Sequence, residues 1–297
     1  MSVFFITGAG PHIGKTYATG YLGKMLFEHG VNVITQKLVQ TGCDEDVATD
    51  IRVHRRMMQM PLQLVDKVSE SCPFVFPFPA SPYLASNLQD VSIHPRRLAV
   101  ATKQLQLQHE LVLLEIEGGI MSPLNESVLT IDYMASQGHP VIVVTSGQPE
   151  SIDQTLLVID ALTQRGLSLH AMIYNQWHDV SVEFTEQTLE DEEQYKLAFD
   201  EHDTGTKIAK HTRRFLQHYL TEHHPDAYWV EMPQVCEYGL DPIYKQWDSF
   251  ETPQASGLTA KNKDKQSSMQ SGLSVSVESY AQKIADTVLY NGRPYRE

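Results

Sequence analysis

The sequence has few cysteines, no long apolar run and a shortage of basic residues. Its three cysteines lie far apart and without C-x-x-C spacing, which excludes a disulfide framework and favours reduced thiols in a cytoplasm. No apolar run approaches the ~20 residues of a membrane span, and no basic region precedes the first apolar residues, so we expect neither a membrane anchor nor a signal peptide. With 23 basic against 37 acidic residues, the net charge of −14 disfavours nucleic acid and membrane surfaces as partners.

The remaining composition is typical of a globular protein. Hydrophobic residues make up 41% of the 297 residues, enough for one large domain or one domain with appendages. Strand and helix patterns alternate over residues 1–176, which predicts an α/β fold with a mostly parallel, twisted sheet and helices on both faces. We expect a domain over 1–250 with an acidic, helical insert at 177–226, a flexible linker at 251–274, and a C-terminal helix or tail at 275–297.

Apolar periodicity predicts the individual elements. The expected strands span residues 3–6, 31–37, 111–115, 140–145, 169–174 and 228–232. The expected helices span residues 16–27, 50–58, 95–110, 130–137, 152–164, the region around 210–219, and 275–290. Within these helices we expect Leu98, Leu105 and Leu107 to be buried, and Tyr280, Ile284 and Val288 to share one face.

The turn between the first strand and the first helix is rich in glycine. Residues 3–16 read VFFITGAGPHIGKT. Backbone N–H groups in such a turn, together with the N-terminus of a helix, form an anion site. Lys15 could reach the β- and γ-phosphates of a nucleotide, and the Thr16 hydroxyl could bind Mg²⁺. The strict G-x-x-x-x-G-K-[ST] pattern would need glycine at Ala9, whereas Gly8 lies one position farther from Gly14. A tight turn with an incidental lysine is the weaker alternative, because Gly-Lys-Thr follows a predicted strand.

Four further polar residues lie near the carboxyl ends of predicted parallel strands, where ligands bind in open α/β sheets. Taken singly, Lys37 could be a solvated surface lysine, Asp50 a residue that favours a helix dipole, and Asn175 a turn cap. Glu115 ends an apolar strand, and a carboxylate there needs a cation or hydrogen-bond donors. Their shared position favours a functional interpretation for all four.

The same segments resemble the dethiobiotin synthetase family. The glycine spacing of the first loop is that of the family, and residues 37–42 (KLVQTG) resemble its Lys-Pro-(Val/Leu)-x-(Ser/Thr)-Gly motif, with Leu38 in place of proline. Residues 115–124 (EIEGGIMSPL) resemble Glu-Gly-Ala-Gly-Gly-x-x-x-Pro-Leu. Further matches are the Thr-Asp pair at 49–50, the PASP loop at 79–82 and Asn175 after a strand.

The resemblance implies a P-loop domain, a homodimer and an ATP-dependent ligase of the cyclo-ligase type that acts in biotin synthesis. An amine of 7,8-diaminononanoate would take up CO₂ (from bicarbonate) to give a carbamate. ATP would phosphorylate the carbamate, and the second amine would close the ring to dethiobiotin, with Mg²⁺ required.

The resemblance also assigns roles to residues of this chain. The implied catalytic residues are Lys37, Lys15 and Thr41. The implied nucleotide-binding residues are Gly8, His12, Ile13, Gly14, Lys15, Thr16, Asn175 and Pro233. The implied magnesium ligands are Thr16, Asp50 and Glu115. The chemistry of these residue types agrees with the roles, because two lysines neutralise phosphoryl charge, oxygen ligands suit Mg²⁺, and an amide can pair with an adenine edge.

Three features depart from the family pattern, one of which is the extra length that residues 177–226 and the tail after residue 250 give the chain. In the first loop Pro11 removes a backbone donor, which His12 could replace. The family holds its substrate carboxylate, across the dimer interface, at a Leu-Gly-x-x-Asn motif near residues 147–150. Here Glu150 would repel a carboxylate, although Ser151 could still donate a hydrogen bond. Two alternatives therefore stay open: a related P-loop enzyme acting on another carboxylate or amine substrate, and an ATP-binding regulatory paralogue with little turnover.

Overall fold

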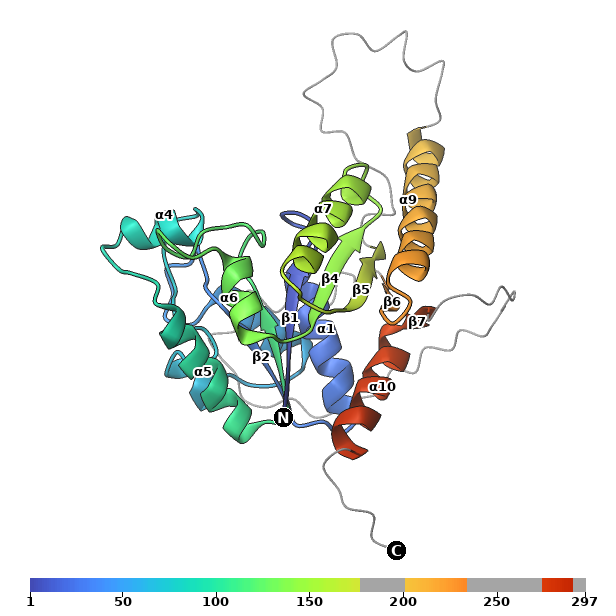
Figure 1. The fold of residues 1–297 in the computed structure, drawn as a ribbon. Helices are drawn as coiled ribbons and strands as arrows, with labels where there is room; N and C mark the ends of the chain where they lie inside the picture. Colours follow the sequence, from blue (N-terminus) through green and yellow to red (C-terminus); the bar gives the residue numbers. More distant parts are fainter. Residues whose placement is uncertain (177–200, 234–273, 291–297) are drawn as a thin grey trace, which may run out of the picture.

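The computed structural model describes residues 1–176, 201–233 and 274–290, and within them a single sheet of seven strands (Figure 1). The strand order is β2-β3-β1-β4-β5-β6-β7, and every neighbouring pair is parallel. The strands are β1 (Ser2–Gly8), β2 (Val33–Lys37), β3 (Leu111–Glu115), β4 (Val141–Ser146), β5 (Leu169–Asn175), β6 (Tyr228–Met232) and β7 (Ser274–Ser276). The α/β class that the sequence predicts is thus confirmed.

The helices connect these strands. They are α1 (Lys15–Glu28), α2 (Thr49–Met57), α3 (Leu64–Lys67), α4 (Pro82–Asn87), α5 (Pro95–Gln108), α6 (Thr130–Gln137), α7 (Ser151–Gln164), α9 (Glu201–His223) and α10 (Val277–Tyr290). Proline opens both α4 and α5, where its missing N–H is not needed and its fixed φ favours the first helical turn. None of the helices in the described ranges has both the length and the apolar character to span a membrane.

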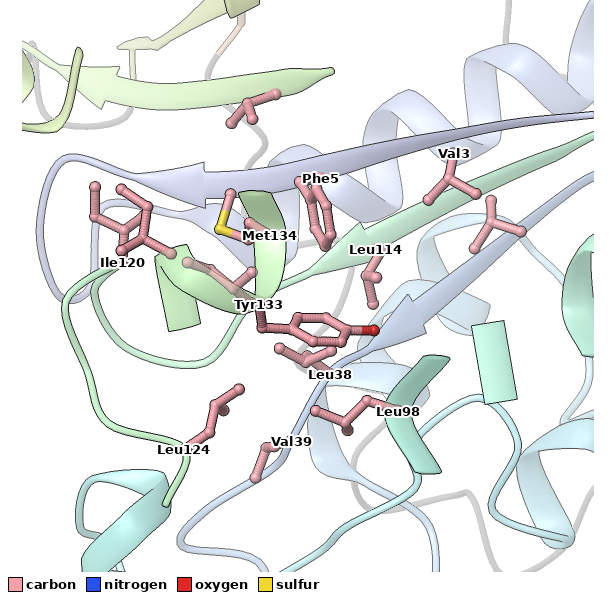
Figure 2. Packing of buried hydrophobic residues seen from close by; sticks show 14 of the residues in the cluster. Val3, Phe5, Leu38, Val39, Leu98, Leu114, Ile120, Leu124, Tyr133 and Met134 are labelled. Atoms are coloured by element: carbon pink, nitrogen blue, oxygen red, sulfur yellow. The ribbon is translucent and has the colours of Figure 1, made fainter. Parts of the chain in front are cut away.

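Helices cover both faces of the sheet because side chains alternate along each strand. Val3 and Phe5 of β1 pack in a cluster with side chains of α5, α6 and α7, part of which Figure 2 shows around Phe5, Leu98 and Tyr133. Phe4 and Ile6 point to the opposite face and pack with α1 and α10. A third cluster joins α7 and α9 over β5 and β6.

Most predicted elements agree with the structure to within two residues, but the helix expected around 210–219 is longer, Glu201–His223, and further details differ. Leu107 is 61% exposed although Leu98 and Leu105 are buried. Leu107 follows Leu105 by two positions, about 200° around the helix, so the two cannot share a face. The sequence pattern also missed β7 and the short helices α3 and α4. The expected linker lies outside the described residues apart from Ser274, which begins β7.

The predicted shared face of the C-terminal helix is confirmed. Tyr280 and Ile284 are buried, and Val288 packs against the same cluster. Because all strands run in the same direction, the loops after β1, β2, β3, β4 and β5 meet at one edge of the sheet. The predicted site residues lie along that edge.

Candidate active site

The loop between β1 and α1 is held in shape by a close approach of β5. Gly14 precedes α1 with a φ of +92°, a left-handed conformation that favours glycine. A Cβ atom at this position would also collide with the Asn175 side chain. Asn175 Nδ2 donates a hydrogen bond to the carbonyl oxygen of Ile13 at 3.1 Å. The end of β5 therefore fixes the loop directly ahead of the α1 N-terminus.

Lys15 follows Gly14 and lies beside this loop. Its Nζ donates to the carbonyl oxygen of Gly10 at 3.4 Å, a long hydrogen bond that an anionic ligand can replace. Burial and the nearby Lys37 ammonium lower the pKa of Lys15. His12 has a φ of +53° and an exposed side chain at the mouth of the pocket described below.

Lys37 ends β2 and is surrounded by three carboxylates. Its Nζ lies 2.6 Å from Asp50 Oδ2, 2.8 Å from Glu115 Oε1 and 2.8 Å from Glu117 Oε2. An ammonium carries three donor hydrogens, so each carboxylate can accept one. The side chain is only 2% exposed. Burial alone would lower the pKa of Lys37, but the three carboxylates outweigh burial and raise it well above its ordinary value.

Glu115 ends the neighbouring strand β3, paired in register with Lys37. Besides Lys37, it accepts a hydrogen bond from Thr16 Oγ1 at 3.0 Å and lies 2.9 Å from His54 Nε2. Burial opposes the charged form, but the Lys37 ammonium and the contact with His54 outweigh it and hold the pKa of Glu115 below its usual range. The expectation that a carboxylate at this strand end needs a cation or donors is confirmed.

The loop after β2 is tied to both neighbouring elements. Thr41 Oγ1 donates to Glu117 Oε1 at 3.2 Å. Gln40 Oε1 accepts from the backbone N–H of Asp50 at 3.1 Å, which fixes the first turn of α2. Gln40 Nε2 donates to the carbonyl oxygen of Thr41 at 3.1 Å. These contacts place Asp50 opposite the end of β3.

A pocket of about 650 Å³ lies over these groups, which is within the ordinary range for small-molecule sites. Its lining residues come from the first loop, α1, the first turn of α2, and the carboxyl ends of β2, β3, β5 and β6. They are Pro11, His12, Ile13, Gly14, Lys15, Thr16, Tyr17, Lys37, Gln40, Asp50, Glu115, Glu117, Gly118, Asn175 and Met232.

The structure brings most of the predicted site residues to this pocket, and three lie next to it. Gly8 is buried at the end of β1, where an added Cβ would meet Ile13 and Lys15. Thr41 reaches the pocket through Glu117, and Pro233 is the exposed residue after Met232.

Sequence reasoning missed several residues of the site, above all Glu117 and His54. Glu117 lies inside a motif that was recognised for Glu115. His54 lies four positions after Asp50, and residues four apart share a helix face, so that spacing was the available signal.

The turn between β4 and α7 contains Glu150 and Ser151, where the chain departs from the family pattern. Ser151 begins α7 and is buried, with its hydroxyl 3.1 Å from Ser146 Oγ. Glu150 precedes it and is exposed. The hydroxyl that could have bound a carboxylate at this helix start therefore contacts the end of β4.

The oxygen atoms around Lys37 are of the type that Mg²⁺ prefers. Glu115 accepts the Thr16 hydroxyl and shares the Lys37 ammonium with Asp50, so these three residues come together from three elements. In residues 1–176, 201–233 and 274–290 no group of three or more His, Cys, Asp and Glu side chains forms a metal site by itself. A magnesium ion here would need phosphate and water oxygens as further ligands, as is usual for this ion in phosphoryl-transfer sites.

Comparison with known proteins identifies a matching family and similar relatives. Residues 2–219 match the family described as "AAA domain". The "ATP-dependent dethiobiotin synthetase BioD 2" of Pasteurella multocida is 37% identical over 233 residues, covering 78% of this chain and 98% of the relative. The protein of the same name from Haemophilus ducreyi is 36% identical, covering 77% and 97%. Among solved structures, a ParA family ATPase from Chlorobium tepidum TLS aligns with a TM-score of 0.38 at 11% identity, covering 69% of this chain and 81% of that one.

Proposed function

This chain belongs to the dethiobiotin synthetase family, and we propose that the pocket at the carboxyl edge of its sheet is the site of ATP-dependent dethiobiotin formation. The activity is that of an ATP-dependent ligase of biotin synthesis. The observation that carries the assignment of the site is the position of Lys37. Its ammonium lies beside Asp50 and Glu115 and shares one pocket with the glycine-rich loop and Lys15.

In this proposal the first loop and α1 bind the triphosphate. The backbone N–H groups at the start of α1 favour phosphate oxygens, and Lys15 exchanges its long bond to Gly10 for a phosphate. Asn175 would present its amide to a base near Met232 and Pro233, and it also holds the loop through Ile13. The nucleotide would thus extend from β5 and β6 towards the ends of β2 and β3.

Lys37 and Thr41 act at the other end of the pocket. One amine of the diamine forms an N–C bond with CO₂ and loses a proton, which gives a carbamate. A carbamate oxygen then attacks the γ-phosphorus, and the bond from that phosphorus to the leaving ADP breaks. The second amine attacks the carbamate carbon, phosphate leaves, and the ring closes. Both lysines face developing negative charge throughout, and holding such charge is the main contribution of a protein to phosphoryl transfer.

The residues around Lys37 fit a bound Mg²⁺. Thr16, Asp50 and Glu115 would hold it, and it would neutralise charge on the phosphates when bound. The charges support this fit. Apart from His12 and Tyr17, the ionisable groups that line the pocket are two lysines and three carboxylates, so one negative charge is in excess before a triphosphate arrives.

We also propose that the chain acts in the cytoplasm as a homodimer. The free, buried thiols of Cys43 and Cys72 support a reducing compartment. The homodimer rests on the family resemblance alone. Sedimentation of the purified protein would test it, because a monomer at assay concentrations would exclude the dimer.

The function is tested by measuring phosphate release from ATP. We expect release that requires 7,8-diaminononanoate, bicarbonate and Mg²⁺ together, and growth of a strain that lacks dethiobiotin synthetase when this chain is expressed. Substituting Lys15→Ala should abolish phosphate release while leaving the fold intact, since the side chain carries no ion pair in the described structure. Phosphate release that does not depend on the diamine would instead support a different acceptor. Wild-type protein that binds no ATP would overturn both the proposed function and the alternative with a different acceptor.

A further inference from the structure

Glu117 contacts Lys37 and Thr41, two of the residues that the proposed reaction needs at the γ-phosphate. We propose that Glu117 is a positioning residue that holds Lys37 and Thr41 in place when Mg²⁺ and the nucleotide engage the other carboxylates. This inference rests on the proposed function. Nothing in the assignment of catalytic, nucleotide or magnesium residues above includes Glu117.

The geometry gives each oxygen of Glu117 a separate partner. Oε2 lies 2.8 Å from Lys37 Nζ, and Oε1 accepts the Thr41 hydroxyl at 3.2 Å. Both partners belong to the chain leaving β2, whereas Glu117 belongs to the chain leaving β3. The Glu117 carboxylate therefore connects the ends of the neighbouring strands β2 and β3, and both of these strand ends line the pocket.

The turn after Glu117 directs this side chain inward. Gly118 has a φ of +64°, which favours glycine, and a Cβ atom there would lie 3.0 Å from Ser122 Oγ. Gly118 and Glu117 both line the pocket, and the Glu117 side chain is 22% exposed. The backbone thus reverses direction directly after Glu117, and the Glu117 carboxylate stays next to Lys37.

The three carboxylates around Lys37 are not equivalent once a metal binds. Glu115 accepts the Thr16 hydroxyl, and Asp50 and Glu115 are the carboxylates that the proposed function assigns to Mg²⁺. Glu117 is not one of these two carboxylates, and its other oxygen accepts the Thr41 hydroxyl rather than a group assigned to Mg²⁺. It is therefore the partner that can keep an ion pair with Lys37 in the loaded enzyme.

The position of Glu117 also has an electrostatic cost. A carboxylate beside a triphosphate repels it, so Glu117 weakens phosphate binding unless Lys37 stays next to it. A group that orients Lys37 and Thr41 for reaction, but opposes phosphate binding, should affect turnover and nucleotide affinity in opposite directions. Substituting a residue that merely supports the fold would instead lower both turnover and nucleotide affinity.

The test compares Glu117→Gln with the wild type. We expect kcat for phosphate release, dependent on diamine and bicarbonate, to fall about 10–100-fold, the effect usual for residues that orient a reacting group through another. The KM for ATP should stay within about threefold. Calorimetry with ADP in the absence of Mg²⁺ should show binding at least as tight as in the wild type, because one negative charge leaves the pocket.

Two further variants make the result specific. Glu126→Gln removes an exposed carboxylate from the same connection after β3, so it should leave every quantity unchanged. Asp50→Asn should raise the Mg²⁺ concentration needed for half-maximal rate, whereas Glu117→Gln should not. Thermal unfolding of each variant sets the assay temperature, so that kcat is measured on folded protein.

The outcomes separate this inference from the proposed function. If the wild type shows no diamine-dependent turnover, the proposed function is wrong. If the wild type turns over and Glu117→Gln keeps a kcat within about twofold of it, the positioning role is wrong. The positioning role would also be overturned if Glu117→Gln lost ADP binding in the absence of Mg²⁺ to the same extent as it lost kcat. A higher Mg²⁺ requirement of Glu117→Gln than of the wild type would overturn it as well.

Discussion

At the scale of single residues, the buried ammonium of Lys37 keeps three carboxylates together. The Lys37→Met substitution keeps the bulk of the side chain and removes that charge. Breaking a buried ion pair by removing one partner costs roughly 3–5 kcal/mol, so we expect a lower free energy of unfolding of that order. Turnover should fall by about 10²–10³-fold or more, because a donor to the transferred group is lost.

Urea unfolding and phosphate-release assays measure the two effects of Lys37→Met. The matched control is Lys24→Met, which removes a surface lysine 3.8 Å from Glu28 on the same helix. We expect this control to change stability by less than about 0.5 kcal/mol and to leave turnover unchanged. Equal losses of stability in the two variants would show that the three carboxylates do not depend on Lys37.

Lys37 and Glu115 could be found from the sequence because each ends an apolar strand, and the carboxyl ends of parallel strands meet at one edge. Glu117 and His54 could not be found in that way. Each acquires its place from a contact between elements far apart in the sequence, as His54 does with Glu115. Residue type and spacing predict which groups reach an edge, but not which groups pair there.

At the scale of elements, the sequence predicts those with a strong apolar period and misses the others. Helix α6 has the bounds expected of it, and Gly138 in the left-handed conformation marks its C-terminal end. The strand β7 has only three residues with a largely exposed pattern, and its pairing with β6 comes from the docking of α10. Such an element exists through tertiary contact rather than local preference.

The contact of α10 with α1 and the sheet gives a paired prediction. Tyr21 of α1 donates to Glu278 of α10 at 2.6 Å, so Tyr21→Phe should lower the free energy of unfolding by about 0.5 kcal/mol at neutral pH. Tyr280 of α10 is buried, and its hydroxyl has no hydrogen-bond partner among the described residues. Tyr280→Phe should therefore raise the free energy of unfolding by up to about 1 kcal/mol.

The effect of pH distinguishes these two tyrosines. Burial would raise the pKa of Glu278, but several hydrogen bonds, the largest of them from Tyr21, together with the nearby His29 outweigh burial and lower this pKa. A depressed carboxyl pKa contributes stability above the ordinary value of about 4.3, and that contribution is lost as pH falls through the lowered value. Urea unfolding at several pH values should show the Tyr21→Phe penalty shrink below about pH 4. A penalty that persists at low pH, or two variants that shift stability alike, would contradict this account.

At the scale of the whole molecule, the charge of the protein and the charge of its pocket have the same sign. The net charge is −14, and the carboxylates that line the pocket outnumber its lysines by three to two. A nucleotide without metal therefore meets repulsion both at long range and at contact, where only the loop amides and the lysines oppose it. A bound divalent cation offsets the repulsion of the nucleotide at contact, whereas added salt weakens only the long-range repulsion.

ATP binding should consequently depend strongly on Mg²⁺. We expect calorimetry to give a Kd for ATP at least tenfold lower with Mg²⁺ than with a chelator, a difference of about 1.4 kcal/mol or more. The control is sodium chloride at the same ionic strength, which screens the overall charge but cannot join Thr16, Asp50 and Glu115 to a phosphate. If sodium chloride tightened binding as much as Mg²⁺ does, the net charge of the protein rather than a metal at these residues would control nucleotide affinity.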